Sequence, residues 1–182
     1  YAARPSSLKN TIKRRMNKLK KDHTVEFKIC KKPYETETAI QHFQSIYSQS
    51  WKKDEPYHNF IPELVKASAK KGWLRMGLLS IDKEVIAAQI WFSLHNTAYI
   101  YKLCHLDSYS QYSPGTLLTA YLMEAVIDED RVQKIDFLSG NDRYKQLWMS
   151  CYNKQWGIQI TNFKSFFGVQ KAIKNIICEK TS

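Results

Sequence analysis

The sequence predicts one α/β domain in which helices flank a central, mostly antiparallel sheet. Three successive runs of strand character, 73–80, 85–94 and 97–103, are joined by short turns at Asp82-Lys83 and His95-Asn96. Helical apolar patterns lie on both sides of this meander along the chain. With 182 residues, 43% of them hydrophobic, the chain is long enough to bury one core.

The first element is a basic helix over residues 5–21. Pro5-Ser6-Ser7 is a helix-start signal, and one apolar stripe follows at helical spacing, formed by Leu8, Ile12, Met16 and Leu19. Residues 1–32 hold eleven Lys or Arg against two acids, so +9 of the net charge of +11 lies here. We predict that the stripe docks on the domain while the basic faces stay in water. Binding of a phosphate-rich partner such as RNA, a nucleotide cofactor or an anionic membrane is the alternative.

A strand and two helices precede the meander. Residues 25–30 alternate apolar and polar side chains, which is the period of a half-buried strand. A helix over 34–50 carries its apolar face on Ile40, Phe43, Ile46 and Tyr47. After a polar, aromatic loop at 51–57, a further helix is expected from Pro62 to Lys71, ending at Gly72.

The C-terminal half continues with alternating helices and strands. A helix opens at Pro114 with a broad apolar face, and residues 135–138 form a short buried strand. Asp142 is expected to cap a short helix that runs to Met149. Residues 156–161 read as a strand and 163–178 as a basic amphipathic helix. No repeat or linker divides the chain, so residues 1–182 are predicted to form a single domain.

Several classes of protein are excluded by missing motifs. The P-loop, dinucleotide-binding, zinc-protease and nucleophile-elbow signatures do not occur. The cysteines, at 30, 104, 151 and 178, are too widely spaced for a zinc site or a disulfide framework, and the five histidines are dispersed. We therefore expect no metal, no permanently bound cofactor and no transmembrane segment, and a cytoplasmic location. The start at Tyr1 suggests a piece of a longer protein.

One helix start carries a weak signal for anion binding. At Pro114-Gly115-Thr116, the N–H groups of Gly115, Thr116 and Leu117 are expected to point out of the helix N-terminus. The helix dipole favours phosphate oxygens at this position. A pyrophosphate group is the ligand this start would suit, although Pro-Gly at a helix start is also common turn chemistry.

Blocks spread over nearly the whole chain resemble a known family. They are residues 2–11, Ser50-Trp51-Lys52 through Pro56-Tyr57, 72–75, 86–91, 98–103, Ser113-Pro114-Gly115-Thr116-Leu117-Leu118 and Asp136-Phe137-Leu138-Ser139-Gly140 with Tyr144-Lys145 and Trp148. Together they resemble the CelD-like acetyltransferase domain of the GNAT superfamily, which is related to FemAB-type transferases. Members of this family often have two GNAT-like halves, and this chain resembles the second half.

The resemblance implies a GNAT fold and an acyl-CoA co-substrate. In that fold a splayed strand of the meander binds the pantetheine arm, here between Tyr99 and His105, with Tyr101 and Leu103 as contacts. The following helix start binds the pyrophosphate, here through Ser113, Gly115 and Thr116. The sequence departs from the usual Q/R-x-x-G-x-G/A signature, because Pro114 and Thr116 stand at its glycine positions when Gln111 is aligned.

The resemblance also implies residues for the chemistry. Asp136 is placed to accept the amine proton or to orient the amine, and a structural ion pair or a turn cap is the alternative reading. Tyr144, with Lys145 beside it, stands where many GNAT enzymes keep a tyrosine that protonates the leaving thiolate. Aromatic residues expected to line the acceptor pocket, unless they are core residues, are Trp51, Tyr57, Trp91 and Tyr99.

The sequence therefore predicts a GNAT-type N-acyltransferase that uses acyl-CoA, with acetyl-CoA as the expected donor. The acceptor is an amine on a small molecule or on a cell-envelope precursor. A FemAB-like aminoacyl transferase that uses aminoacyl-tRNA is a second possibility, since a basic helix suits a polyanionic donor. A non-catalytic module that binds nucleic acid or a membrane surface is a third.

Overall fold

The computed structural model describes residues 4–50, 56–140, 142–154, 156–158, 160–170 and 173. The chain divides into two compact units, Tyr1–Met149 and Ser150–Ser182. The first unit contains, in order, α1 (Ser6–Asp22), β1 (Val25–Cys30), the 3-10 helix η1 (Pro33–Glu35), α2 (Thr36–Ser48), α3 (Phe60–Lys70), β2 (Leu74–Ile81), β3 (Glu84–Leu94), β4 (Thr97–His105), the 3-10 helix η2 (Asp107–Tyr112), α4 (Pro114–Asp128), β5 (Lys134–Asp136) and α5 (Arg143–Trp148).

The five strands form one sheet in the order β1-β2-β3-β4-β5. Neighbours are antiparallel as far as β4, whereas β4 and β5 are parallel. Both turns of the meander have two left-handed residues, at Asp82-Lys83 and His95-Asn96. Such turns match the right-handed twist of paired strands, which is why they close tight hairpins. The predicted α/β class with a mostly antiparallel sheet is confirmed.

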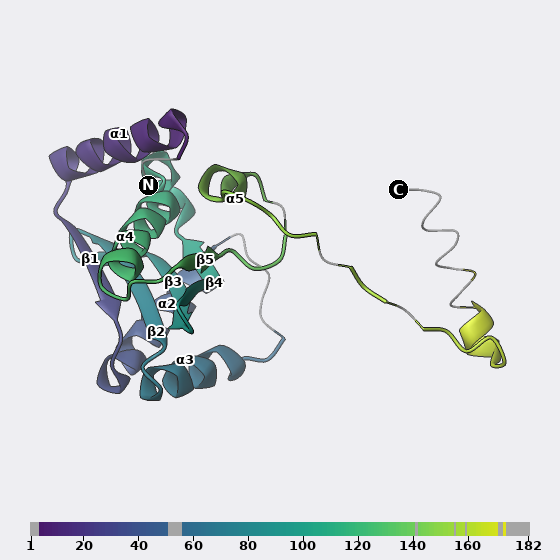
Figure 1. Cartoon of the computed structure of the whole chain (residues 1–182). Coiled ribbons are helices and arrows are strands. Elements are labelled where there is room, and N and C mark those ends of the chain that lie inside the picture. Colours follow the sequence, from purple (N-terminus) through teal and green to yellow (C-terminus); the bar gives the residue numbers. More distant parts are fainter. Residues whose placement is uncertain are drawn as a thin grey trace. The chain divides into compact units, whose positions relative to one another are not determined.

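Helices cover both faces of the sheet (Figure 1). On one face, Leu8 and Leu19 of α1 pack with Leu118 of α4 and Trp148 of α5 in one core cluster. On the other face, α2 and α3 build a second cluster with residues of β2 and β3. Gly77 on β2 allows the close approach of α4, because a Cβ there would lie 2.7 Å from Leu122 Cδ1.

The basic N-terminal helix docks as predicted. Leu8 and Leu19 are buried, and Ile12 and Met16 pack against the same cluster. Most of the cationic side chains of α1 remain exposed. Lys18 lies over the ring of Tyr112, with Nζ 5.4 Å from the ring centroid, so α1 also meets the segment that leads into α4.

Two predicted elements after α5 differ from the structure. The described residues among 156–161 are not in a strand, and Ile158 and Ile160 are each 92% exposed. A strand needs a neighbour to bond its backbone groups, and this segment has no place in the five-strand pairing. Of the predicted helix over 163–178, residues 166–170 and 173 are helical, and the others beyond 170 lie outside the described residues.

The described part of the chain contains no group of three His, Cys, Asp or Glu side chains that could hold a metal ion. Cys30 and Cys104 are buried free thiols and Cys151 is an exposed one, while Cys178 lies outside the described residues. No helix within the same residues is long and apolar enough to cross a membrane.

Candidate active site

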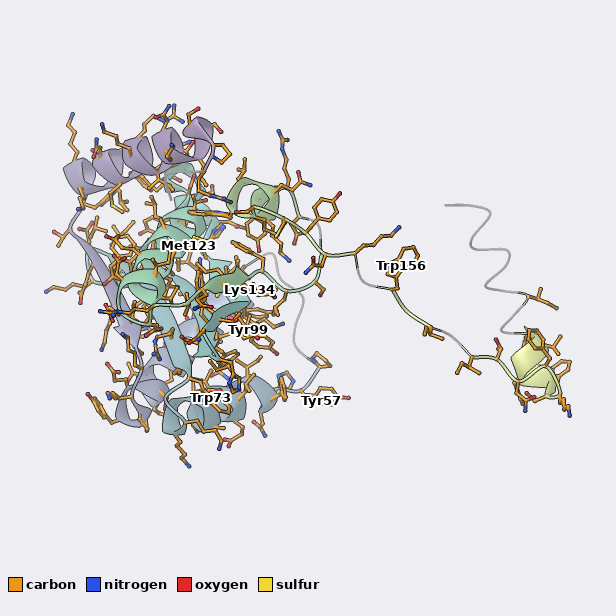
Figure 2. The ribbon with its side chains drawn as sticks, in the orientation of Figure 1. Tyr57, Trp73, Tyr99, Met123, Lys134 and Trp156 are labelled. Carbon is orange, nitrogen blue, oxygen red and sulfur yellow. The ribbon has the colours of Figure 1, made fainter. Side chains whose placement is uncertain are left out.

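β5 pairs with only the first part of β4, and we call the place beyond its last residue the opening between β4 and β5. Pairing between these strands covers only three residues of each, and it ends where Tyr99 meets Asp136. β4 runs on to His105 while it continues to pair with β3. Figure 2 labels Tyr99 and Lys134 on the two neighbouring strands, next to this point. Among the described residues, no strand pairs with β4 on its β5 side beyond Tyr99.

A β-bulge interrupts β4 at the same place. Ile90 pairs with Lys102 and Trp91 with Ile100, so Tyr101 is an extra residue in β4. A bulge twists its strand and re-aims the side chains beyond it. The ring of Tyr101 packs against that of Phe92, with the ring centroids 5.5 Å apart. Both are partly buried residues on the α2 side of the sheet. Leu103 pairs with Gln89, whose side chain contacts α4, so Leu103 faces the α4 side.

The start of α4 meets the end of β4. Ser113 is left-handed, with φ 55° and ψ 52°, and it precedes Pro114 at the first helical position. A Cβ added to Gly115 would lie 3.4 Å from Cδ2 of His105, the last residue of β4. The helix start and the end of β4 therefore lie within contact distance of each other.

The predicted set of free N–H groups at this helix start is corrected by the structure. The N–H groups of Thr116 and Leu117 donate to the carbonyl oxygen of Ser113, at 3.0 and 3.1 Å. The bond from Leu117 is the ordinary i→i−4 bond of an α-helix, and Thr116 shares the same acceptor. Only the N–H of Gly115 has no acceptor among the described residues. The half-buried Gly115 and Thr116 still face partly to solvent.

Asp136 is the last residue of β5 and is half-buried. Its carboxylate accepts a hydrogen bond from Lys134 Nζ at 2.7 Å, and it also accepts the N–H of Leu138 at 2.9 Å. The bond from Lys134 is the main cause that lowers the pKa of Asp136, and the Leu138 N–H adds to it. A carboxylate with a lowered pKa is ionised at neutral pH but is a weaker base, which favours orientation of the amine over acceptance of its proton.

Tyr144 lies on α5, next to the end of β5. Its ring meets that of Phe137 edge-on, with the centroids 6.5 Å apart, and 40% of the residue is exposed. Burial and, to a lesser extent, the negative charge of Asp142 raise the pKa of Tyr144. Its hydroxyl group therefore keeps its proton at neutral pH, as a general acid requires.

Lys145 is buried, and its ammonium group is bonded within the loop after β5. It is 6% exposed, and its Nζ donates to the carbonyl oxygen of Ser139 at 2.5 Å and lies 3.4 Å from Asp142 Oδ2. Its ammonium group is thus directed into the loop after β5, where Leu138 and Gly140 have positive φ. We conclude that Lys145 holds this loop. The expected cap is also absent, because Asp142 makes no side-chain hydrogen bond to the start of α5.

Of the four aromatic residues expected at the acceptor pocket, the three that the structure describes do not gather in one place. Trp91 is fully buried and donates its indole N–H to Gln89 at 2.8 Å, so it is a core residue. Tyr57 is 75% exposed and precedes α3, and Trp51 lies outside the described residues. The half-buried Tyr99 is the member of the set that lies at the opening between β4 and β5.

The sequence reasoning missed Gln89. This side chain is fully buried in β3 and bonds to the first turn of α4. The available signal was an amide within the apolar run 86–91, where a buried polar group needs partners.

A hollow of about 280 Å³ lies on the second half of α4, toward the opposite end of this helix from Gly115. It is lined by Tyr121, Glu124, Ala125, Asp128 and Glu129.

Comparison with known proteins identifies the family. Residues 6–146 match the family model described as Acetyltransferase (GNAT) domain. A search of curated protein sequences found no match.

Solved structures with the same fold include three acetyltransferases. A possible acetyltransferase from Clostridium difficile 630 has a TM-score of 0.54 and 11% identity, over 76% of this chain and 99% of its own. AAC(6')-Iy, in complex with a bisubstrate analogue of CoA and acetylneamine, has a TM-score of 0.55 and 11% identity, over 76% and 99%. A ribosomal-protein-alanine N-acetyltransferase from Brucella melitensis biovar Abortus 2308 has a TM-score of 0.52 and 11% identity, over 78% and 100%. At these identities the likeness establishes the fold.

Proposed function

This chain belongs to the GNAT acetyltransferase family, and from that membership we propose that it transfers an acetyl group from acetyl-CoA to the nitrogen of an amine. The family match makes the protein an acyltransferase. The choice of donor, the class of acceptor and the roles of individual residues are our proposal. The observation that carries it is the meeting of the open edge of β4 with the start of α4.

The donor is proposed to bind along this edge. Pantetheine contains two amide groups, which suit the backbone N–H and C=O groups of Tyr101 and Leu103 in the manner of an added strand. The pyrophosphate then meets the start of α4, where the Gly115 N–H and the hydroxyls of Ser113 and Thr116 offer donors. The positive end of the α4 dipole favours negative charge at the same place.

The chemistry is a direct transfer. The amine nitrogen attacks the thioester carbonyl carbon, a C–N bond forms, and the C–S bond breaks. Asp136, ionised through its lowered pKa, orients the incoming amine, which passes its proton to solvent. Tyr144 gives its proton to the departing thiolate and recovers one from water. The products are an amide and CoA with a free thiol.

The acceptor is proposed to be an amine on a small molecule or on a cell-envelope precursor, and it approaches past Tyr99. Among the similar structures, AAC(6')-Iy is in complex with a bisubstrate analogue of CoA and acetylneamine, and the Brucella melitensis protein is a ribosomal-protein-alanine N-acetyltransferase. Within the family we propose the CelD-like type, related to FemAB transferases, and a cytoplasmic site of action. We also propose that the chain is the C-terminal half of a longer protein.

The test is a continuous assay for free thiol, with acetyl-CoA as donor and a panel of primary amines that includes aminoglycosides, amino sugars and peptides with free N-termini. We expect thiol release that depends on both substrates. A thermal-shift screen with acetyl-CoA and with aminoacyl-tRNA identifies the donor, because a ligand that binds only the native state raises Tm. Stabilisation by aminoacyl-tRNA alone would replace our proposal with a FemAB-like reaction. Binding of RNA through α1 without any turnover would replace it with the binding module.

A further inference from the structure

A buried hydrogen-bond network joins the middle of β3 to the first turns of α4. Gln89 is fully buried on β3, and its Nε2 donates to the carbonyl oxygen of Gly115 at 2.8 Å and to Thr119 Oγ1 at 2.9 Å. The Thr119 hydroxyl in turn donates to the same Gly115 oxygen at 2.8 Å. Trp91 Nε1 donates to Gln89 Oε1 at 2.8 Å, which satisfies the other end of the amide.

This network is more than core packing. Burying an amide without hydrogen-bond partners lowers the free energy of unfolding, whereas burying an apolar side chain of the same size raises it. A polar side chain in a core is therefore expected only where its hydrogen bonds are satisfied. Here every polar atom of Gln89 has a partner, and both Nε2 hydrogens are directed at α4. A satisfied buried network fixes geometry more narrowly than apolar contacts do.

The part of α4 that the network fixes is its start. The carbonyl of Gly115 belongs to the peptide that joins Gly115 to Thr116, within the first turn. No side chain caps this helix, so the usual means of fixing its first turn is missing. Gln89 also pairs with Leu103 across β3 and β4, and therefore the same residue is tied both to the donor-binding part of β4 and to the helix start.

We propose that Gln89 and Thr119 are positioning residues for the donor: they hold the first turn of α4 so that Gly115 and Thr116 meet the pyrophosphate. This inference rests on the proposed function, since the pyrophosphate belongs to the proposed acetyl-CoA. The two residues touch neither the donor nor the acceptor. They act through the Gly115–Thr116 peptide.

The test compares two donors in the full 182-residue chain. S-acetylpantetheine carries the same thioester as acetyl-CoA but has no pyrophosphate. Thr119→Val removes the hydroxyl and keeps the shape, whereas Thr119→Ser keeps the hydroxyl. We expect Thr119→Val to lower kcat/KM for acetyl-CoA by about tenfold or more relative to S-acetylpantetheine, because small displacements of binding groups are costly. Thr119→Ser should restore the ratio to within about twofold.

Thr36→Val is the matched control. Thr36 is also a buried threonine, and its hydroxyl donates to the carbonyl oxygen of Pro33 at 2.8 Å, at the start of α2 on the other face of the sheet. A loss of stability alone should lower the rates with both donors and leave their ratio unchanged. Gln89→Leu should reduce the ratio further, and if that variant does not fold, the Thr119 pair carries the test.

The outcomes separate the two proposals. If the wild-type chain neither binds nor uses acetyl-CoA, the proposed function is wrong. If the wild-type chain uses acetyl-CoA and Thr119→Val leaves the donor ratio unchanged, the proposed function stands and the positioning role of Gln89 and Thr119 is overturned.

Discussion

Replacing Gly115 with glutamate should separate donor binding from folding. Gly115 lies in the first turn of α4, and its φ is not in the left-handed region. A Cβ there would meet one atom, His105 Cδ2, at 3.4 Å, which is ordinary contact. A carboxylate near a helix N-terminus stabilises the helix by about 0.3–1 kcal/mol, and the loss of glycine from the helix adds a similar amount. We therefore expect an unchanged or higher Tm.

Donor binding should change in the opposite direction. The new carboxylate would stand where the pyrophosphate is proposed to bind. Two unit charges of the same sign about 5 Å apart repel by about 3 kcal/mol at an effective dielectric constant of about 20. This energy corresponds to a rise in Kd of about a hundredfold.

The assay is titration calorimetry with acetyl-CoA, together with thermal denaturation followed by circular dichroism. Gly115→Gln is the control for bulk, because it has nearly the same size without the charge, and Gly115→Ala is the control for the added Cβ alone. Wild-type affinity in Gly115→Glu, with the fold intact, would show that no pyrophosphate binds at this helix start. The donor site would then have to be sought elsewhere.

Three other predictions concern catalysis and stability. Tyr144→Phe should lower kcat by about tenfold to a thousandfold with little change in the KM for acetyl-CoA. Because the pKa of Tyr144 is raised, kcat should fall at alkaline pH with an apparent pKa above the ordinary tyrosine value of about 10. Asp142→Asn should lower this apparent pKa, because it removes a negative charge that raises the pKa of Tyr144. Asp136→Asn should lower the free energy of unfolding at pH 7, and this deficit should vanish as the pH falls through the lowered pKa of Asp136, in denaturant titrations over acidic pH. Leu19→Ala should lower the free energy of unfolding, measured by urea denaturation, by about 2–5 kcal/mol, because Leu19 is fully buried. Lys20→Ala should change the same free energy by less than about 0.5 kcal/mol.

Local pattern was sufficient for most of the first unit. The alternation in residues 25–30 gave β1 with the predicted bounds, and Pro114 marked the start of α4. These elements depend on backbone propensity and on a single buried face, and both can be read from neighbouring residues. Near the C-terminus, the pattern of residues did not lead to the predicted strand. The alternation at 156–161 predicts a strand, but a strand forms only where another strand supplies hydrogen-bond partners.

The arrangement of the candidate site was decided by tertiary structure. The sequence placed Trp91 among possible pocket residues and Lys145 among possible catalytic residues, and packing directed the first into the core and the second into the loop after β5. Likewise, the sequence predicts an anion-binding helix start at Gly115, but only the structure shows that the N–H groups of Thr116 and Leu117 already donate to the carbonyl oxygen of Ser113.

By itself, the sequence determined the α/β class, the order of the elements in the first unit and the docking stripe of α1. Each of these follows from the periodicity of apolar residues, which is a local property. Only the tertiary structure determined the opening between β4 and β5, the bulge at Tyr101 and the bond from Gln89 to Gly115. These features depend on strand register and on contacts between residues far apart in the chain, and they are set when the whole core packs at once.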